Sequence, residues 1–197
     1  IILGTQMLAK GHHFPDVTLV ALLDIDSGLF SVDFHAGEKL AQMIVQVAGR
    51  SGRADKRGCV VLQTRQPQHP FLTCLINQAY QAFAKMALQE RKQASLPPYS
   101  HQALLRVHAK DAQSPQQFLQ QVTGILQQLN TGKTLILGPV PAPMARRAGQ
   151  FRFQLLLQSA QRKELHHLLD MALPQFSQLK QANKVRWSLD VDPVDLY

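Results

Sequence analysis

The chain has 197 residues, of which 45% are hydrophobic and 17% charged, ordinary values for a globular protein with one large or two small domains. No apolar run approaches the roughly 20 residues of a membrane span, so we expect a soluble, cytoplasmic chain without a membrane partner. The net charge is +8, which favours an acidic partner, with nucleic acid the first candidate.

The two cysteines, Cys59 and Cys74, give neither a disulfide framework nor metal-ligand spacing. Both fall in apolar segments, so we expect reduced core thiols and no metal site. The adjacent pair His12 and His13 lacks a further ligand at suitable spacing. The opening IILGTQ is typical of the end of a buried strand, and we expect the chain to be the C-terminal piece of something longer.

The first half alternates strand and helix patterns. Val17–Leu23 is typical of a strand buried on both faces, and Cys59–Leu62 is a second short strand. Residues 35–50 and Pro70–Lys92 have the apolar stripes of amphipathic helices. This order predicts a parallel α/β layer.

One stretch of this half, Gln46–Arg53, reads QVAGRSGR. On a continuous helix, Gln46, Arg50 and Arg53 share one face, and two guanidiniums beside glycines suit a closely approached polyphosphate. A helix C-terminus with basic residues against its own dipole is the alternative.

Two stretches together, GTQMLAKGHHFPDVTLV (4–20) and QVAGRSGR, resemble the fifth and sixth motifs of superfamily 2 helicases. The segments LLDIDSGLFSVDFHAGEKLAQMIVQVAGR and ERKQASLPPYSH, and the closing DVDP, narrow the resemblance to the bacterial PriA-type family of replication-restart helicases. The resemblance covers nearly the whole chain. It implies the later part of a RecA-like second helicase lobe, followed by a small C-terminal domain likened to a ribosomal protein.

The resemblance also implies roles for residues. Arg50 and Arg53 match the sixth-motif arginines that reach ATP across the lobes and act in catalysis, and Gln46 matches a residue that orients the nucleotide. An arginine at a transferring phosphoryl group is worth roughly 10³–10⁵ in rate. In the fifth motif, Thr5 and Gln6 match residues that contact the nucleic-acid backbone. Lys10 and Gly11 match residues that couple this loop to the nucleotide.

Three acidic or basic positions need separate treatment. His13 stands where many of these helicases carry a ribose-contacting Asp, so the resemblance does not assign that contact. Asp24 and Asp26 follow a strand end, where carboxylates hold Mg²⁺ or, more often, cap a helix or pair with arginine; we favour the structural role at the lobe interface.

Residues 131–134, TGKT, superficially match the tail of a phosphate-binding P-loop. That motif needs glycine five residues before the Gly-Lys pair, where Gln127 stands, and needs a strand before it and a helix after it. We interpret TGKT as a helix-to-strand turn. ATP and Mg²⁺ would be bound mainly by a lobe that this chain lacks.

In the second half, Ser95–Tyr99 (SLPPY) marks a domain boundary. The following periodicities give strand, helix, strand, strand, helix and strand, the split βαβ arrangement of a small α+β domain. Ser114 is expected to cap the first of these helices, with Pro115 at its first position. Leu135–Val140 is expected to be a strand.

Between the two middle strands, GPVPAPMARRAGQFR (138–152) is expected to be a stiff, exposed connection carrying Arg146, Arg147 and Arg152. It is either a solvated hairpin tip or a contact with DNA phosphates. Phe151 and Phe153 match core packing better than base stacking. The basic surface, with Arg162 and Lys163, is an alternative binding site for the acidic tail of single-stranded-DNA-binding protein.

We therefore expect three segments: residues 1–72, the C-terminal part of helicase lobe 2; residues 73–98, a connecting helix and Pro-Pro linker; and residues 99–197, an α+β domain that binds DNA or protein. The resemblance implies a parent enzyme that hydrolyses ATP, moves 3′ to 5′ on DNA, recognises branched forks and single-stranded DNA, and works with other primosome proteins at the nucleoid. The family's structural zinc lies outside this chain, and the chain alone is expected to be inactive. A non-enzymatic module that binds branched DNA or protein is the alternative.

Overall fold

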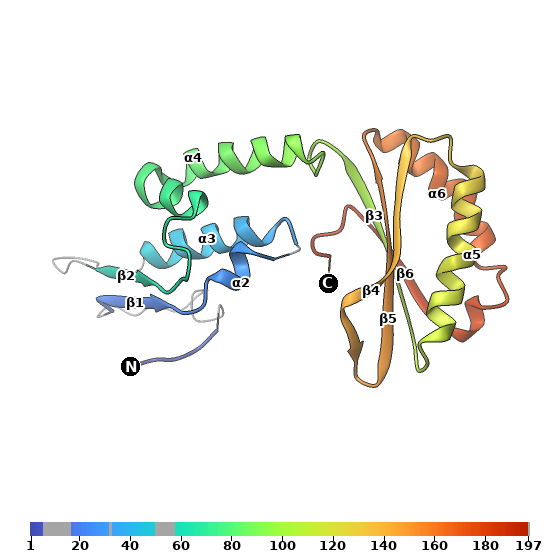
Figure 1. The fold of residues 1–197 in the computed structure, drawn as a ribbon, viewed down its shortest axis with the longest axis horizontal. Coiled ribbons are helices and arrows are strands. Elements are labelled where there is room, and N and C mark those ends of the chain that lie inside the picture. The colour runs from blue at the N-terminus through green and yellow to red at the C-terminus, as the bar shows by residue number, and fades with distance from the viewer. Residues whose placement is uncertain (6–16, 32, 50–57, 197) are drawn as a thin grey trace. The chain divides into compact units, whose positions relative to one another are not determined.

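The structure is a computed structural model that describes residues 1–5, 17–31, 33–49 and 58–196. It divides into two compact units, Ile1–Gln89 and Glu90–Tyr197. The division falls within helix α4 (Pro70–Gln93), inside the segment that the sequence analysis assigns to a connecting helix and linker. Figure 1 labels the elements.

The first unit contains a small parallel sheet and helices. Strands β1 (Leu19–Leu22) and β2 (Cys59–Leu62) pair in parallel, with Leu19 opposite Cys59 and Leu22 opposite Leu62. Helices α2 (Asp26–Leu29) and α3 (Ala36–Ala48) lie between these strands in sequence. The parallel α/β pairing is therefore as expected from the sequence.

Exposed and half-buried residues alternate along β1 and β2, so the expectation that β1 is buried on both faces is wrong. Leu19 is 61% exposed, and Val61 on β2 is also exposed. The two strands are the whole of this sheet in the described residues. Cys59 is likewise exposed and Cys74 is half-buried, so the expectation that both are core thiols is wrong for Cys59.

The core of the first unit is formed by one side of α3, residues of α4, and Ile25 in the segment between β1 and α2. Leu40, Ala41 and Ile44 lie at helical spacing on α3, as the sequence stripe predicts. The whole buried set is Ile25, Leu40, Ala41, Ile44, Leu72, Leu75 and Phe83. Within α4, Ala79 leaves the helical region (φ 69°, ψ 174°), so this helix is interrupted, which its apolar stripe does not reveal.

The second unit has the βαββαβ order expected from the sequence. Its elements are β3 (His101–Ala109), α5 (Gln113–Leu129), β4 (Thr134–Arg147), β5 (Gln150–Ser159), α6 (Arg162–Phe176), the short 3₁₀ helix η1 (Ala182–Lys184) and β6 (Arg186–Val191). The four strands form an antiparallel sheet in the order β4-β5-β3-β6. Both α-helices cover the same face of this sheet (Figure 1).

The core of the second unit lies between that covered face and the two helices. Ala103, Leu105 and Val107 on β3 alternate with residues of the opposite face, and all three are buried. Phe118 of α5 and Phe176 of α6 both contact Trp187 of β6, with ring centroids 6.2 Å apart in each pair. Trp187 is the chain's one tryptophan, so its fluorescence reports on this core.

The N-terminus of α5 differs from the expectation in its capping residue. Helix α5 begins at Gln113, and Asp111 accepts hydrogen bonds from the backbone N–H of Ser114 at 2.7 Å and from its hydroxyl at 3.0 Å. Asp111 therefore supplies the acceptor that the sequence analysis assigned to Ser114. Those hydrogen bonds also lower the pKa of the Asp111 carboxyl, the backbone bond most strongly.

The connection between the two middle strands is much shorter than expected. Strand β4 continues to Arg147 and β5 begins at Gln150, so only Ala148 and Gly149 form the loop. Both have positive φ (49° and 76°), as in the two-residue turns that match the twist of a hairpin. The prolines and Gly138 (φ 111°) lie within β4 at register shifts, and they did not prevent pairing with β5.

Candidate functional site

The residues expected to bind nucleotide and DNA fall in two groups, and only some lie in the described part of the chain. Gln6, Lys10, Gly11, Arg50 and Arg53 are outside the described residues, as is His13. Thr5 is exposed just before the first of those gaps. The roles expected for these residues therefore stay predictions.

Gln46 lies in the last turn of α3 and its side chain is exposed. The helix ends at Ala48, and the backbone N–H of Gly49 bonds to the carbonyl of Val45 at 3.0 Å. Arg50 and Arg53 lie outside the described residues, so the helical face that they are expected to share with Gln46 stays a prediction. Gly49 itself keeps helical backbone angles (φ −70°, ψ −5°), so it is not a left-handed glycine cap.

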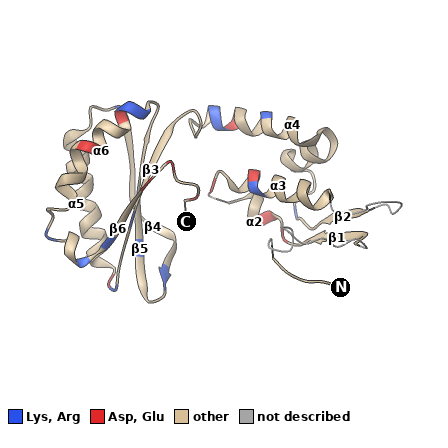
Figure 2. Ribbon diagram, turned by 180° about the vertical axis from the view of Figure 1, so that it is seen from behind, with Lys and Arg blue, Asp and Glu red and all other residues tan. Residues whose placement is uncertain are grey.

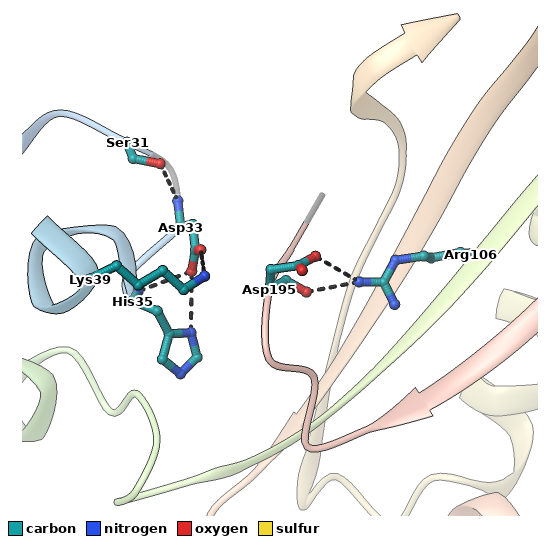
Figure 3. Close-up of polar contacts among 6 residues, drawn as sticks. All are labelled: Ser31, Asp33, His35, Lys39, Arg106 and Asp195. Carbon is teal, nitrogen blue, oxygen red and sulfur yellow. Dashed lines mark hydrogen bonds and ion pairs between the residues drawn. The ribbon is translucent and has the colours of Figure 1, made fainter. Parts of the chain in front are cut away.

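The start of α3 is organised by the buried carboxylate of Asp33, which is 3% exposed. It accepts hydrogen bonds from the backbone N–H of His35 at 2.9 Å and from Lys39 Nζ at 3.0 Å, and it lies 3.2 Å from His35 Nδ1 (Figure 3). Burial raises the pKa of Asp33, but the hydrogen bonds from His35 and Lys39 and the Lys39 charge outweigh it and the pKa is lowered. The sequence analysis missed this residue; an Asp three positions before the first residue of a helix was the available signal.

Asp26 also holds structure together. Its carboxylate accepts hydrogen bonds from the Thr64 hydroxyl and from the backbone N–H of Arg65, so it ties the segment after β2 to the start of α2. These two bonds lower the pKa of Asp26. Asp24 is exposed, and its backbone N–H bonds to Gln63 Oε1 at 3.2 Å. These contacts lie within the first unit, and the role expected for Asp24 and Asp26 at a lobe interface stays a prediction.

Metal-ligating side chains do not gather in this chain as far as it is described. Among those residues, no group of three or more His, Cys, Asp or Glu is placed to hold a metal ion. The described helices likewise include none that is long and apolar enough to cross a membrane.

The TGKT segment is a turn, as interpreted from the sequence. It lies between the end of α5 and the start of β4, and Asn130 Oδ1 accepts hydrogen bonds from the backbone N–H groups of Gly132 and Thr134. Lys133 Nζ donates to Glu164 Oε1 at 2.8 Å. The lysine is thus committed to an ion pair, and no strand leads into the loop as a P-loop requires.

The three arginines around the β4–β5 hairpin do not form one cluster. Arg146 lies opposite Phe151, and its guanidinium carbon is 5.1 Å from the centre of that ring. Arg147 lies opposite Gln150, on the other face, which it shares with Arg152 because side chains alternate along a strand. Phe153 packs against the core, as expected, so its ring does not lie on the uncovered face.

The face of the sheet that α5 and α6 leave uncovered carries polar and charged side chains from all four strands, although Gln102 and Leu104 near the start of β3 are buried on it. Arg106 on β3 donates a hydrogen bond to Asp190 Oδ2 on β6 at 2.8 Å. It also donates to the carbonyl of Asp195 at 2.8 Å (Figure 3). Next along β3 on this face is His108, which lies directly between Arg152 on β5 and Arg186 on β6 in the register. Figure 2 shows blue, basic positions on strands β4, β5 and β6. The geometry therefore concentrates unbalanced positive charge on one end of this face.

The chain therefore has a mixed α/β architecture: a parallel α/β unit is followed by an antiparallel α+β unit with a basic sheet face. The chain belongs to the family "Primosomal protein N C-terminal domain", whose sequence pattern matches residues 92–194.

Relatives match over nearly the full chain. It is 52% identical over 196 residues to the replication restart protein PriA of Haemophilus influenzae, a match that covers 100% of this chain and 27% of that protein. The PriA proteins of Bacillus subtilis and Synechocystis are 34% and 32% identical, covering 98% and 100% of this chain and 24% and 23% of theirs. The chain corresponds to the C-terminal portion of PriA and spans about a quarter of the length of these relatives.

Proposed function

We propose that this chain is the C-terminal part of an ATP-dependent 3′-to-5′ DNA helicase that recognises stalled or branched replication forks and starts primosome assembly. The observation that carries the proposal is the 52% identity to a replication restart protein over the entire chain, which includes both helicase motif stretches. The first unit would then be the later part of a RecA-like second lobe, and the second unit a C-terminal DNA- and protein-binding domain.

In this proposal the first unit supplies side chains rather than the nucleotide site itself. Arg50 and Arg53 stabilise charge on the transferring phosphoryl group, with Gln46 orienting the nucleotide and the Lys10–Gly11 segment coupling it to DNA. Mg²⁺ is held with ATP by the other lobe. The zinc of the parent would also be held elsewhere, since this chain has only two cysteines.

The second unit contributes affinity for polyanions. Residues 99–197 carry eleven basic and six acidic side chains. Thr5 and Gln6 of the first unit, and Arg146, Arg147 and Arg152 of the second, are the DNA contacts that we propose, on branched forks and single-stranded DNA near the nucleoid. Single-stranded-DNA-binding protein and other primosome proteins are the proposed protein partners, and the cytoplasm is the proposed location.

An ATPase measurement tests whether this chain is only part of an enzyme or hydrolyses ATP on its own. The 197-residue chain should show no DNA-stimulated ATP hydrolysis above an Arg53→Ala control, because it offers arginines without a P-loop. The longer protein containing it should hydrolyse ATP when DNA is added. DNA-stimulated turnover by the chain alone would contradict the proposed division, and an inactive longer protein would favour the non-enzymatic binding module.

A further inference from the structure

We propose that the uncovered face of the four-stranded sheet binds the phosphate backbone of DNA through a strip of four side chains, Arg147, Arg152, His108 and Arg186. This strip, here called the sheet-face strip, has one member on each of β4, β5, β3 and β6. The inference rests on the proposed function that this chain contacts DNA, and it moves the contact from the hairpin tip to the sheet.

Strand register places Arg152, His108 and Arg186 side by side, whereas Arg147 is the partner of Gln150 and lies diagonally from Arg152 on the same face. His108 is the partner of Arg152 on one side and of Arg186 on the other. Directly opposite residues of antiparallel strands have Cβ atoms about 4.5–5.5 Å apart on the same face. Across four strands spaced about 4.8 Å apart, the strip is about 14 Å long, too long for one carboxylate or phosphate and suited to a chain of them.

The positive charges of the strip are not balanced within the described part of the chain. Arg152 and Arg186 make no ion pair there. The acidic groups on the same face are already used, since Asp190 and Asp195 both pair with Arg106. An anion from outside the chain is therefore the complement that these arginines lack.

Placing the positive charges of the strip next to one another destabilises the folded chain when no anion is bound. Like charges directly opposite each other on adjacent strands are destabilising. The guanidinium fork also matches phosphate oxygens in two parallel hydrogen bonds. The exposed aromatic rings that stack on bases are missing from this set of side chains, so we expect binding through phosphates without base preference.

His108 makes the binding sensitive to pH. Burial lowers its pKa, and the charges of Arg186 and Arg152 lower it further. The other charge beside it on β3, Arg106, is balanced by Asp190 and Asp195, and Lys110 follows at the end of the strand. A bound phosphate offsets the two arginine charges and favours the protonated imidazole, so DNA binding takes up a proton.

The sign of the effect follows from this uptake. The pKa of His108 is higher in the complex than in the free chain, so the affinity for DNA rises as pH falls through the pKa of the complex. The affinity levels off below the lower pKa of the free chain. Replacing His108 by Gln removes this dependence and leaves the arginine contacts.

The test uses fluorescence anisotropy of labelled oligothymidylate with the 197-residue chain at several salt concentrations. Arg152→Gln with Arg186→Gln should flatten the log–log salt slope by about two units. The matched control, Lys85→Gln with Lys180→Gln, removes the same charge from exposed positions outside the strip and should change the slope less. Trp187 fluorescence verifies that each variant keeps its core.

The pH arm compares binding at pH 6 and pH 8. The chain should bind more tightly at pH 6, and His108→Gln should lose most of that difference while His166→Gln, at an exposed position on α6, keeps it. Calorimetry in buffers of different ionisation enthalpy should detect proton uptake that disappears in His108→Gln.

Three results would overturn parts of the account, and they are distinguishable. If the chain does not bind oligothymidylate at all, the proposed DNA contact by this chain fails. If it binds but the double arginine variant keeps the full salt slope, only the sheet-face strip fails. If a polyglutamate peptide binds as tightly as DNA and depends equally on Arg152 and Arg186, the strip is a site for an acidic protein segment and not for DNA.

Discussion

Arg106 on β3 donates to Asp195 twice, to its backbone carbonyl at 2.8 Å and to its carboxylate at 3.3 Å, and so fixes the segment that follows β6 (Figure 3). The same guanidinium bonds to Asp190 within β6. One side chain therefore joins the central strand, the edge strand and the end of the described chain.

We predict that Arg106→Gln loosens residues 192–196. Loss of hydrogen bonds to charged partners should cost about 1–2 kcal/mol, since the pair is partly exposed. Hydrogen exchange followed by mass spectrometry should show faster exchange in this segment, with the amides of α5 unchanged. Lys110→Gln, which removes the same charge beyond the end of β3, is the control. Equal protection of residues 192–196 in Arg106→Gln and the unmodified chain would refute this role.

The lowered pKa of Asp33 predicts that the first unit loses stability at acidic pH. Its lowered pKa means that the ionised form stabilises the folded state above the unfolded-state pKa, about 3.9, and that this contribution is lost as pH falls through the folded value. Asp33→Asn should destabilise the unit by about 1–3 kcal/mol at pH 7, because it leaves Lys39 and the His35 N–H with a weaker acceptor.

Urea unfolding at pH 7 and at pH 3.5 measures this prediction. Far-UV circular dichroism follows both units, and Trp187 fluorescence follows the second unit alone, which serves as the internal control. The difference between Asp33→Asn and the unmodified chain should shrink at the lower pH. A difference that is the same at both pH values would show that the charge of Asp33 is not what stabilises α3.

The sheet-face strip predicts a conflict between stability and binding. Arg186→Gln relieves repulsion with the groups on β3 and β5, so it should raise the free energy of unfolding of the second unit by up to about 1 kcal/mol while weakening DNA binding. Urea unfolding followed by Trp187 fluorescence, together with the anisotropy measurement, gives both quantities. Loss of stability in Arg186→Gln would mean that the arginine has a structural partner.

Much of the fold could be predicted from periodicity. The alternation Ala103, Leu105, Val107 placed one face of β3 in the core, and the helical spacing of Leu40 and Ile44 did so for α3. These patterns survive because burial of apolar surface acts on every residue of a face at once. The order of elements in the second unit follows from the same signal.

The candidate site was harder to predict because it depends on pairing between distant strands. Arg146, Arg147 and Arg152 are close in sequence, but alternation in a hairpin whose loop has only two residues puts Arg146 on the opposite face. His108 and Arg186 carry no local motif and become neighbours only through the register of β3 and β6. Prolines in 138–147 obscured the strand, because a proline lacks an N–H donor but is tolerated at a sheet edge, which is where β4 lies.

The central claim, that this chain supplies catalytic arginines to a helicase, is tested most directly by DNA-stimulated ATP hydrolysis in the longer protein carrying Arg53→Ala, with DNA affinity measured at fixed salt. The account predicts a fall in ATP turnover of about 10³-fold or more, a smaller rescue by Arg53→Lys, and nearly unchanged DNA affinity. Unchanged turnover, or a loss of DNA affinity as large as the loss of turnover, would contradict it.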